Sequence, residues 1–199
     1  MKNMFFFPLA PYELGFALDG SDSLTTLQFE KVKEFVRAFV RGLTISRNAA
    51  QIGVIEYSDR AEIRVALNDS FNSASLDYGI LYIGQSGGRK ADTVAMLRKA
   101  TDELFSLEGG ARPGVPRYLV VLTGGKDAPS KDLEDAVRKA KENGIRTLVV
   151  DIGDTMDVDA LKVLVPIAED RYGVDDVASL SSIVFRIKKD IVKNVAERK

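Results

Sequence analysis

Asp19, Ser21 and Ser23 are the residues whose types and spacing best fit a chemical role, because they follow an apolar run at alternate positions. One carboxylate and two hydroxyls at this spacing can converge on a hard cation such as Mg²⁺, with water filling the remaining coordination sites. The same residue types also build polar turns and helix caps, and the spacing by itself favours that structural interpretation. Asp22 is expected to point away from the pair of serines, which argues against catalysis by paired carboxylates.

The composition removes several classes of function. The 199 residues include no histidine, cysteine or tryptophan. The chain therefore has no histidine-dependent triad, thiol nucleophile, disulfide or zinc knuckle, and any bound metal must be a hard cation with oxygen ligands. The 28 basic and 29 acidic side chains give a net charge of −1. That balance argues against a nucleic-acid binder that neutralises phosphates.

The length fits one sizeable domain that folds without disulfides. No apolar run approaches the ~20 residues of a membrane span, so membrane insertion is not expected. An apolar block at residues 4–7 is short for a signal-peptide core and is followed at once by Pro8. We expect residues 1–12 to form an N-terminal extension whose phenylalanines pack on the domain, and residues 13–197 to form a single domain. Further domains of the same chain are potential partners.

Short apolar runs predict six strands. Between the second and third lies a tight turn at residues 59–60, and the third alternates apolar with charged side chains, as a half-exposed antiparallel edge strand does. The other runs are typical of buried parallel strands. The six strands are expected at residues 14–18, 51–58, 61–67, 118–122, 145–152 and 172–177.

Capping residues and helical periodicity predict the helices between these strands. Thr25 and Gln28 form a capping box ahead of apolar residues at helical spacing. Ser130 caps a charged helix that ends near Gly144. A last helix begins at residue 179 or 182 and reaches about residue 195. Further helices are expected at residues 75–83, 92–107 and 158–165.

The alternation of strands with helices predicts an α/β fold: a doubly wound, mostly parallel central sheet with one antiparallel edge strand and helices on both faces. Ligands of such sheets bind beyond the carboxyl ends of the strands. The loops at residues 19–23, 84–93 and 123–127 are therefore the expected site. The glycine-rich stretch 84–88 lacks the Lys-Ser/Thr pair of a phosphate-binding loop, so we interpret it as a flexible loop.

Three segments together resemble one known family, the von Willebrand factor type A domain. They are LGFALDGSDS at residues 14–23, IGVIEYS at residues 52–58 and LVVLTGG at residues 119–125. The loop at residues 87–93, followed by a helix, also fits the family. The resemblance covers nearly all of the chain from about residue 13 to residue 195. It is strongest to the extracellular-matrix branch, such as the A domains of type VI collagen and matrilins, and it implies a Rossmann-like fold.

The resemblance further implies a metal-ion-dependent adhesion site built from three loops. The first loop, Asp-x-Ser-x-Ser, is intact. The second loop of the family supplies a threonine, but Ala91 stands at that position and Thr93 matches a different threonine. The third loop supplies an aspartate, and Gly124 stands there. Thr93, which is the nearest hydroxyl, and the carboxylates of Asp92 and Asp127 are the possible additional ligands. The resulting hypothesis is a degenerate site whose divalent cation, Mg²⁺ or Ca²⁺, is weakly bound or absent.

The function implied by the resemblance is a non-enzymatic adhesion module of the extracellular matrix. Its partner would be collagen or another matrix protein, bound at the loops that follow the strands. Arg89, Lys90 and Arg112 are expected on loops near that face, where they could meet an acidic side chain. Two alternatives stay open: an intracellular scaffold domain of the same family, and a small Mg²⁺-dependent enzyme, for which no base, nucleophile or phosphate loop can be assigned.

The last predicted helix is rich in basic residues. Such a helix face either binds acidic glycans or an acidic protein, or is simply solvated, and the solvated face is the commoner case. The residues concerned are Arg186, Lys188, Lys189, Lys193 and Arg198.

Overall fold

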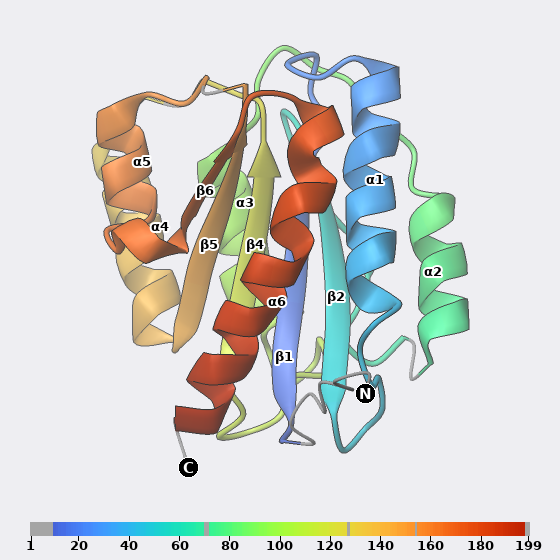
Figure 1. Ribbon diagram of the computed structural model, residues 1–199. Helices are drawn as coiled ribbons and strands as arrows, with labels where there is room; N and C mark the ends of the chain where they lie inside the picture. Colours follow the sequence, from blue (N-terminus) through green and yellow to red (C-terminus); the bar gives the residue numbers. More distant parts are fainter. Residues whose placement is uncertain (1–9, 70–71, 127, 154, 198–199) are drawn as a thin grey trace.

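The computed structural model describes residues 10–69, 72–126, 128–153 and 155–197. Its centre is a sheet of six strands in the order β3-β2-β1-β4-β5-β6 (Figure 1). Neighbouring strands are parallel except β2 and β3, which confirms the predicted sheet with one antiparallel edge strand. The strands are β1 Tyr12–Asp19, β2 Ala50–Tyr57, β3 Ala61–Val65, β4 Arg117–Thr123, β5 Ile145–Ile152 and β6 Arg171–Val174.

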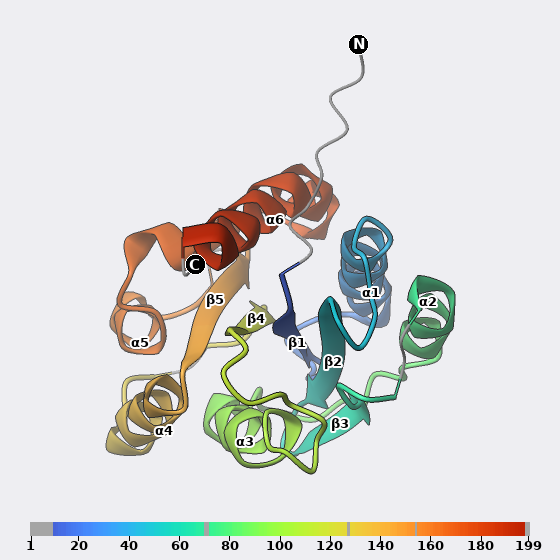
Figure 2. The same cartoon turned by 90° about the horizontal axis from the view of Figure 1, so that it is seen from below.

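Helices cover both faces of the sheet, as predicted for a doubly wound fold (Figure 2). One face is covered by α1, α2 and α6, and the other by α3, α4 and α5. The bounds are α1 Thr26–Val40, α2 Ser73–Leu81, α3 Thr93–Lys99, α4 Lys131–Glu142, α5 Val158–Leu164 and α6 Leu180–Glu197.

The predicted helix caps are present. The Thr25 hydroxyl accepts a hydrogen bond from the Gln28 backbone N–H, and Gln28 Oε1 accepts one from the Thr25 N–H at 2.8 Å, completing the capping box of α1. Ser130 accepts from the N–H of Leu133 at the start of α4. Gly144 follows α4 with a φ of 72°, a backbone conformation that favours glycine.

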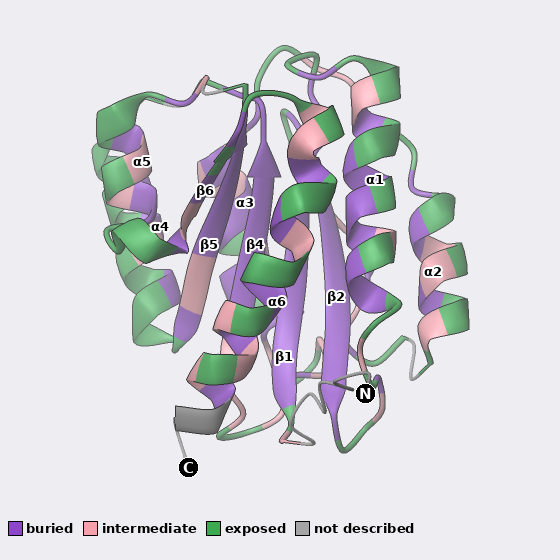
Figure 3. Cartoon of the chain, in the orientation of Figure 1, coloured by how far each residue is buried: buried purple, intermediate pink, exposed green. Residues whose placement is uncertain are grey.

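A hydrophobic core lies on each face of the sheet, and the central strands are buried on both sides (Figure 3). Leu14, Phe16 and Leu18 of β1 belong to the core under α1 and α6, whereas Ala17 belongs to the core under α3. Burial on both sides explains why β1 reads as a continuous apolar run. Among the described residues, no helix is both long and apolar enough to cross a membrane. The expected packing of the N-terminal phenylalanines concerns residues 1–9, which lie outside the described residues.

The single helix predicted over residues 92–107 is interrupted. α3 gives way to a π-helical turn at Ala100–Leu104. Ideal Cβ atoms built on Gly15 and Gly53 would lie 3.1 and 2.5 Å from methyl carbons of Leu104, so the two glycines leave the space that this side chain fills. The prediction of a continuous helix was wrong because the π-helical turn accompanies the contact of Leu104 with Gly15 and Gly53. The local spacing of apolar residues carries no sign of that contact.

Lys188 departs from the basic face predicted for the last helix. Its side chain is buried between α6 and α1, with Nζ 5.0 Å from the centre of the Phe39 ring and 3.3 Å from the carbonyl oxygen of Ala38. Burial lowers its pKa. Arg186, Lys189 and Lys193 are exposed as expected, and Arg198 lies outside the described residues.

Candidate functional site

The site begins where β1 ends. Asp19 is the last residue of β1, which lies between β2 and β4 at the middle of the sheet, and its side chain is fully buried. The hydroxyl of Ser21 donates a hydrogen bond to Asp19 Oδ1 at 2.6 Å, and the hydroxyl of Ser23 donates to Oδ2 at 2.7 Å. The two hydroxyl oxygens are 3.0 Å apart. The structure therefore brings the three predicted residues together.

The loop after β4 reaches the same carboxylate. Thr123 Oγ1 and the backbone N–H of Gly124 each donate to Asp19 Oδ2 at 3.2 Å. With the backbone N–H and hydroxyl of Ser21 and the hydroxyl of Ser23, Asp19 accepts five hydrogen bonds. Hydrogen bonds of this kind stabilise an ionised carboxylate without a cation. No ion pair to Asp19 occurs in the part of the chain that the structure describes.

The second loop presents a methyl group to this cluster. A Cβ atom built on Gly125 would lie 2.9 Å from the Ala91 methyl carbon and 3.4 Å from Asp19 Oδ2, so Ala91 borders the site without offering a ligand. Thr93 is buried at the first position of α3. Asp92 Oδ1 caps α3 by accepting from the Ala95 N–H at 2.9 Å. The remaining candidate ligand, Asp127, lies outside the described residues.

Gly124 has little room for a side chain. A Cβ atom at this position would lie 2.7 Å from Leu24 Cδ2 and 3.6 Å from the hydroxyl oxygen of Ser23. Leu24 is itself buried. A carboxylate at position 124 would thus point toward the hydroxyl cluster, but Leu24 would have to move.

A second buried carboxylate, Glu56, lies near the end of β2 beside the first loop. Its Oε2 accepts hydrogen bonds from the Ser86 hydroxyl at 2.6 Å and from Arg64 Nη2 at 3.0 Å. A Cβ on Gly20 would lie 1.8 Å from Glu56 Oε1, so any larger residue there would displace the Glu56 carboxylate. Glu56 was not predicted from the sequence. It pairs with Leu18 in the register of β1 and β2, and aligning the ends of these two strands would have placed it there.

A third buried carboxylate, Asp151, lies near the end of β5. Its two oxygens accept from the N–H groups of Thr155 at 3.3 Å and Met156 at 3.4 Å. The Thr155 hydroxyl then donates to the carbonyl of Gly124 at 3.0 Å, which links the loop after β5 to the site. Asp151 could have been identified from the sequence as a polar residue at a strand end, because it follows an apolar run as Asp19 does.

Backbone hydrogen bonds join the first loop to the glycine-rich loop. The Asp22 N–H donates to the Gly88 carbonyl at 2.8 Å, and the Gly87 N–H donates to the Gly20 carbonyl at 2.9 Å. Gly87 and Gly88 have φ angles of 71° and 115°, which favour glycine. Gln85 Nε2 adds a third link by donating to the Ser21 carbonyl at 3.1 Å. These hydrogen bonds hold the glycine-rich loop against the first loop, in contrast to the flexible loop expected from the sequence.

A hollow of about 590 Å³ adjoins these loops. Its charged lining consists of the carboxylates of Asp22 and Glu30, and Thr25 and Gln85 contribute polar groups. A hollow lined in this way favours a ligand group that donates hydrogen bonds or carries positive charge. It lies beside the hydroxyl cluster and enlarges the surface that a partner could contact.

The predicted partner-binding residues do not lie together. Arg89 and Lys90 are exposed next to the glycine-rich loop, as expected. Arg112 lies at the opposite end of the sheet, where its Nε donates to Glu13 Oε1 at 2.8 Å and its Nη2 to the Ala49 carbonyl at 2.8 Å. The prediction for Arg112 was wrong because its loop leads into β4, and a segment entering a parallel strand lies at the edge away from the strand's carboxyl end.

Comparison with known proteins agrees with this geometry. Residues 13–186 match the von Willebrand factor type A domain. Chicken (Gallus gallus) matrilin-1 is 31% identical over 182 residues, covering 90% of this chain and 36% of that protein. Mouse (Mus musculus) integrin alpha-M is 28% identical over 194 residues, covering 92% of this chain and 16% of that protein. The chain thus spans only a minor part of these relatives' length.

Solved structures share the fold. Proximal thread matrix protein 1 from the mussel byssus superposes with a TM-score of 0.84 at 18% identity, covering 90% of this chain and 47% of that one. Another structure of the same mussel protein, described as having a zinc-occupied MIDAS motif, gives a TM-score of 0.82 at 19% identity, covering 94% of this chain and 48% of that one. From its family match and its matrilin likeness, the chain belongs to the von Willebrand factor type A domain family.

Proposed function

We propose that residues 13–197 form an extracellular, non-enzymatic adhesion domain that binds collagen or another matrix protein. The observation that carries the proposal is the Asp19 cluster, in which hydrogen bonds from two loops converge on one buried carboxylate at the end of the sheet. The likeness to matrilin-1 supports a matrix partner. The domain would contact that partner with the loops that follow β1 and β4 and with the glycine-rich loop.

The loops around Asp19 suit a protein partner that carries both hydrogen-bond donors and acidic side chains. The hollow lined by Asp22 and Glu30 would receive a hydroxyl or a basic side chain. Arg89 and Lys90, exposed beside it, would attract an acidic side chain. Mixed charges of this kind favour one orientation of the partner.

The domain's cation would be bound weakly or not at all. The described residues contain no group of three or more acidic side chains that could hold a metal ion. Asp19 already accepts five hydrogen bonds, Ala91 offers only a methyl group, and Gly124 has no side chain. Hard divalent cations take at least six oxygen ligands and favour carboxylates, so this donor set fits such an ion poorly. Adhesion would then not depend strictly on metal.

Retention on fibrillar collagen tests the proposed function. We expect the chain to be retained equally with and without EDTA. Asp19→Ala should reduce the affinity by about tenfold or more, because it removes the shared acceptor of both loops and leaves their donors unpaired. Lys131→Ala, an exposed change on α4, is the matched control. No retention of the unmodified chain on collagen or any other matrix component would contradict the proposal.

Titration calorimetry with millimolar Mg²⁺, Mn²⁺ and Ca²⁺ tests the cation separately. We expect a weak isotherm or none for the unmodified chain. Ala91→Thr combined with Gly124→Asp adds one hydroxyl and one carboxylate beside Asp19 and should tighten binding by about tenfold or more. Adding Leu24→Ala frees the space that the new carboxylate needs. A clear isotherm for the unmodified chain that disappears in Asp19→Ala would contradict weak binding.

A further inference from the structure

Two tyrosines form a pair on the outer surface of α2. Tyr78 lies in this helix and Tyr82 directly follows its last residue. The centres of the two rings are 4.6 Å apart and the ring planes are tilted by 51°, because residues four apart in a helix are neighbours on its surface. The two residues are 63% and 68% exposed, so both rings are open to reagents in the solvent.

The other tyrosines of the chain are shielded from solvent. The chain has six tyrosines, all within the described residues. Four of them are at most 4% exposed, namely Tyr12, Tyr57, Tyr118 and Tyr172. Cysteine and tryptophan, which compete with tyrosine for oxidants that remove single electrons, are absent from the chain. A one-electron oxidant in solution therefore meets Tyr78 and Tyr82 first.

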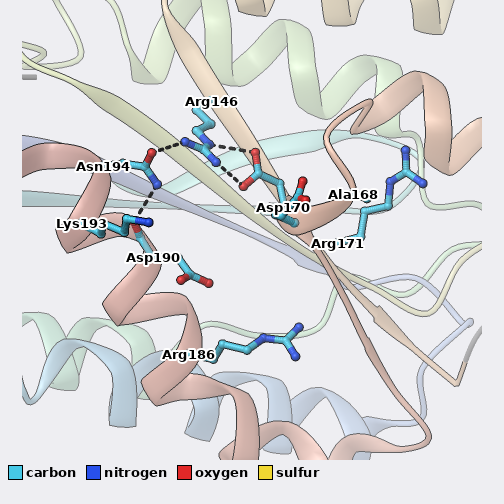
Figure 4. A pocket seen from close by; sticks show the side chains of 9 residues that line it. Arg146, Ala168, Asp170, Arg171, Arg186, Asp190, Lys193 and Asn194 are labelled. Carbon is cyan, nitrogen blue, oxygen red and sulfur yellow. Dashed lines mark hydrogen bonds and ion pairs between the residues drawn. The ribbon is translucent and has the colours of Figure 1, made fainter. Parts of the chain in front are cut away.

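Tyr172 shows how a buried ring is shielded. The guanidinium of Arg186 lies over this ring, with Cζ 4.4 Å from the ring centre, and the Tyr172 hydroxyl donates to Asp190 Oδ2 at 2.7 Å. Both covering side chains extend from α6 beside a pocket (Figure 4). An oxidant at the surface is therefore kept from this ring, whereas it has access to the rings of Tyr78 and Tyr82.

The backbone that carries the exposed pair is held by a buried lysine. Lys33 of α1 donates from Nζ to the carbonyl oxygens of Leu81 and Ile83, at 3.0 and 2.9 Å, so the residues on each side of Tyr82 are fixed to α1. The inner face of α2 packs into the core. A side-chain hydrogen bond with Tyr82 raises the pKa of Tyr78. The two phenols therefore start from a set relative position.

We propose that Tyr78 and Tyr82 are an oxidative modification site, at which a peroxidase and hydrogen peroxide join the two rings as dityrosine. The oxidant removes one electron and the phenolic proton from each hydroxyl. The two radicals then form a carbon–carbon bond between the ring carbons adjacent to the hydroxyl-bearing carbons. Each newly bonded carbon releases a proton, and each phenol oxygen takes one up. Hydrogen peroxide accepts two electrons and two protons and becomes two molecules of water.

The geometry favours coupling within one chain over coupling between chains. Ring centres 4.6 Å apart are close to the separation of two benzene rings joined by a single carbon–carbon bond, so the rings need to move little. Two radicals held side by side also react without having to meet by diffusion. The link would give a chain without cysteine a covalent bridge on its surface. The proposal is independent of the adhesion site, since neither tyrosine lies in the loops around Asp19.

Treating the full chain with a haem peroxidase and hydrogen peroxide tests this site. We expect dityrosine fluorescence from a product that stays monomeric and whose mass is lower by two hydrogen atoms, with Tyr78 and Tyr82 linked in the peptide map. Tyr82→Phe keeps the ring but removes the phenol, and should lower the yield of this product by about tenfold or more, because the remaining phenol has no neighbour held beside it. Tyr78→Phe should give the same loss.

The matched control keeps two exposed tyrosines but separates them. Tyr82→Phe combined with Val158→Tyr places the second phenol at an exposed position of α5, at the other end of the sheet from α2 (Figure 1). This variant should form dityrosine only between chains. Thermal melts check that every variant folds. Three results would each overturn the proposal: no dityrosine in the unmodified protein, dityrosine only between its chains, or an undiminished monomeric product in any of these variants.

Discussion

Arg112→Ala is expected to lower the free energy of unfolding by about 3–5 kcal/mol, because it leaves a buried carboxylate without its cation. Glu13 is fully buried, and Arg112 is its ion-pair partner at 2.8 Å. Arg112 also donates to the carbonyl oxygens of Tyr12, Arg47 and Ala49. The substitution therefore removes several bonds that hold the loop before β4 to the starts of β1 and β2. Urea denaturation measures the loss.

Two further variants test whether the stability lost in Arg112→Ala comes from the buried ion pair with Glu13. Arg138→Ala removes an exposed arginine that pairs with Asp135 and Glu142 on α4, and should change the free energy of unfolding very little, because solvent screens exposed ion pairs. Glu13→Met combined with Arg112→Met replaces both charges by apolar groups and should recover much of the stability lost in Arg112→Ala. Similar small losses in Arg112→Ala and Arg138→Ala would contradict the role assigned to Arg112.

Leu104→Ala is expected to cost about 3–5 kcal/mol, because it empties space inside the core. Leu104 is fully buried and contacts the positions where Gly15 and Gly53 lack side chains. Gly53→Ala alone should cost about 1–3 kcal/mol through overpacking, since its Cβ would lie 2.5 Å from Leu104 Cδ1.

The double variant Leu104→Ala/Gly53→Ala gives the sharper test. The new methyl group on residue 53 would occupy part of the cavity, so the combined loss should be smaller than the sum of the single losses. Urea denaturation of all four proteins gives the coupling directly. Leu107→Ala, which changes a residue with 71% of its surface exposed, should have little effect. Additive losses would show that Leu104 and Gly53 do not share this contact.

The sequence predicts best what is local. Asp19, Ser21 and Ser23 lie within five residues at the end of one strand, so their convergence follows from a single turn. The mostly parallel sheet with helices on both faces follows from alternating strands and helices, but this alternation does not fix the strand order, because doubly wound sheets occur with more than one order. The π-helical turn at Ala100–Leu104 does not follow from the local sequence either, because the glycines that Leu104 contacts lie on two strands far away in sequence.

Long-range ion pairs escape sequence reasoning for a related reason. Arg112 and Glu13 are 99 residues apart, and nothing in either segment identifies the other as its partner. Glu56 and Asp151 were missed although each lies near the end of a strand. Both accept hydrogen bonds from groups of the neighbouring loops, so they hold those loops in place and their partners are not evident from the strand itself.

The buried Lys188 gives α6 a mechanical property. Its Nζ would lie 2.7 Å from a Cβ on Gly42, so the ammonium occupies a space that exists only because residue 42 has no side chain. A force that pulls α6 along its axis must withdraw this charged group past the end of α1 and away from the Phe39 ring. Such a displacement would also break the hydrogen bond from Lys188 Nζ to the Ala38 carbonyl oxygen.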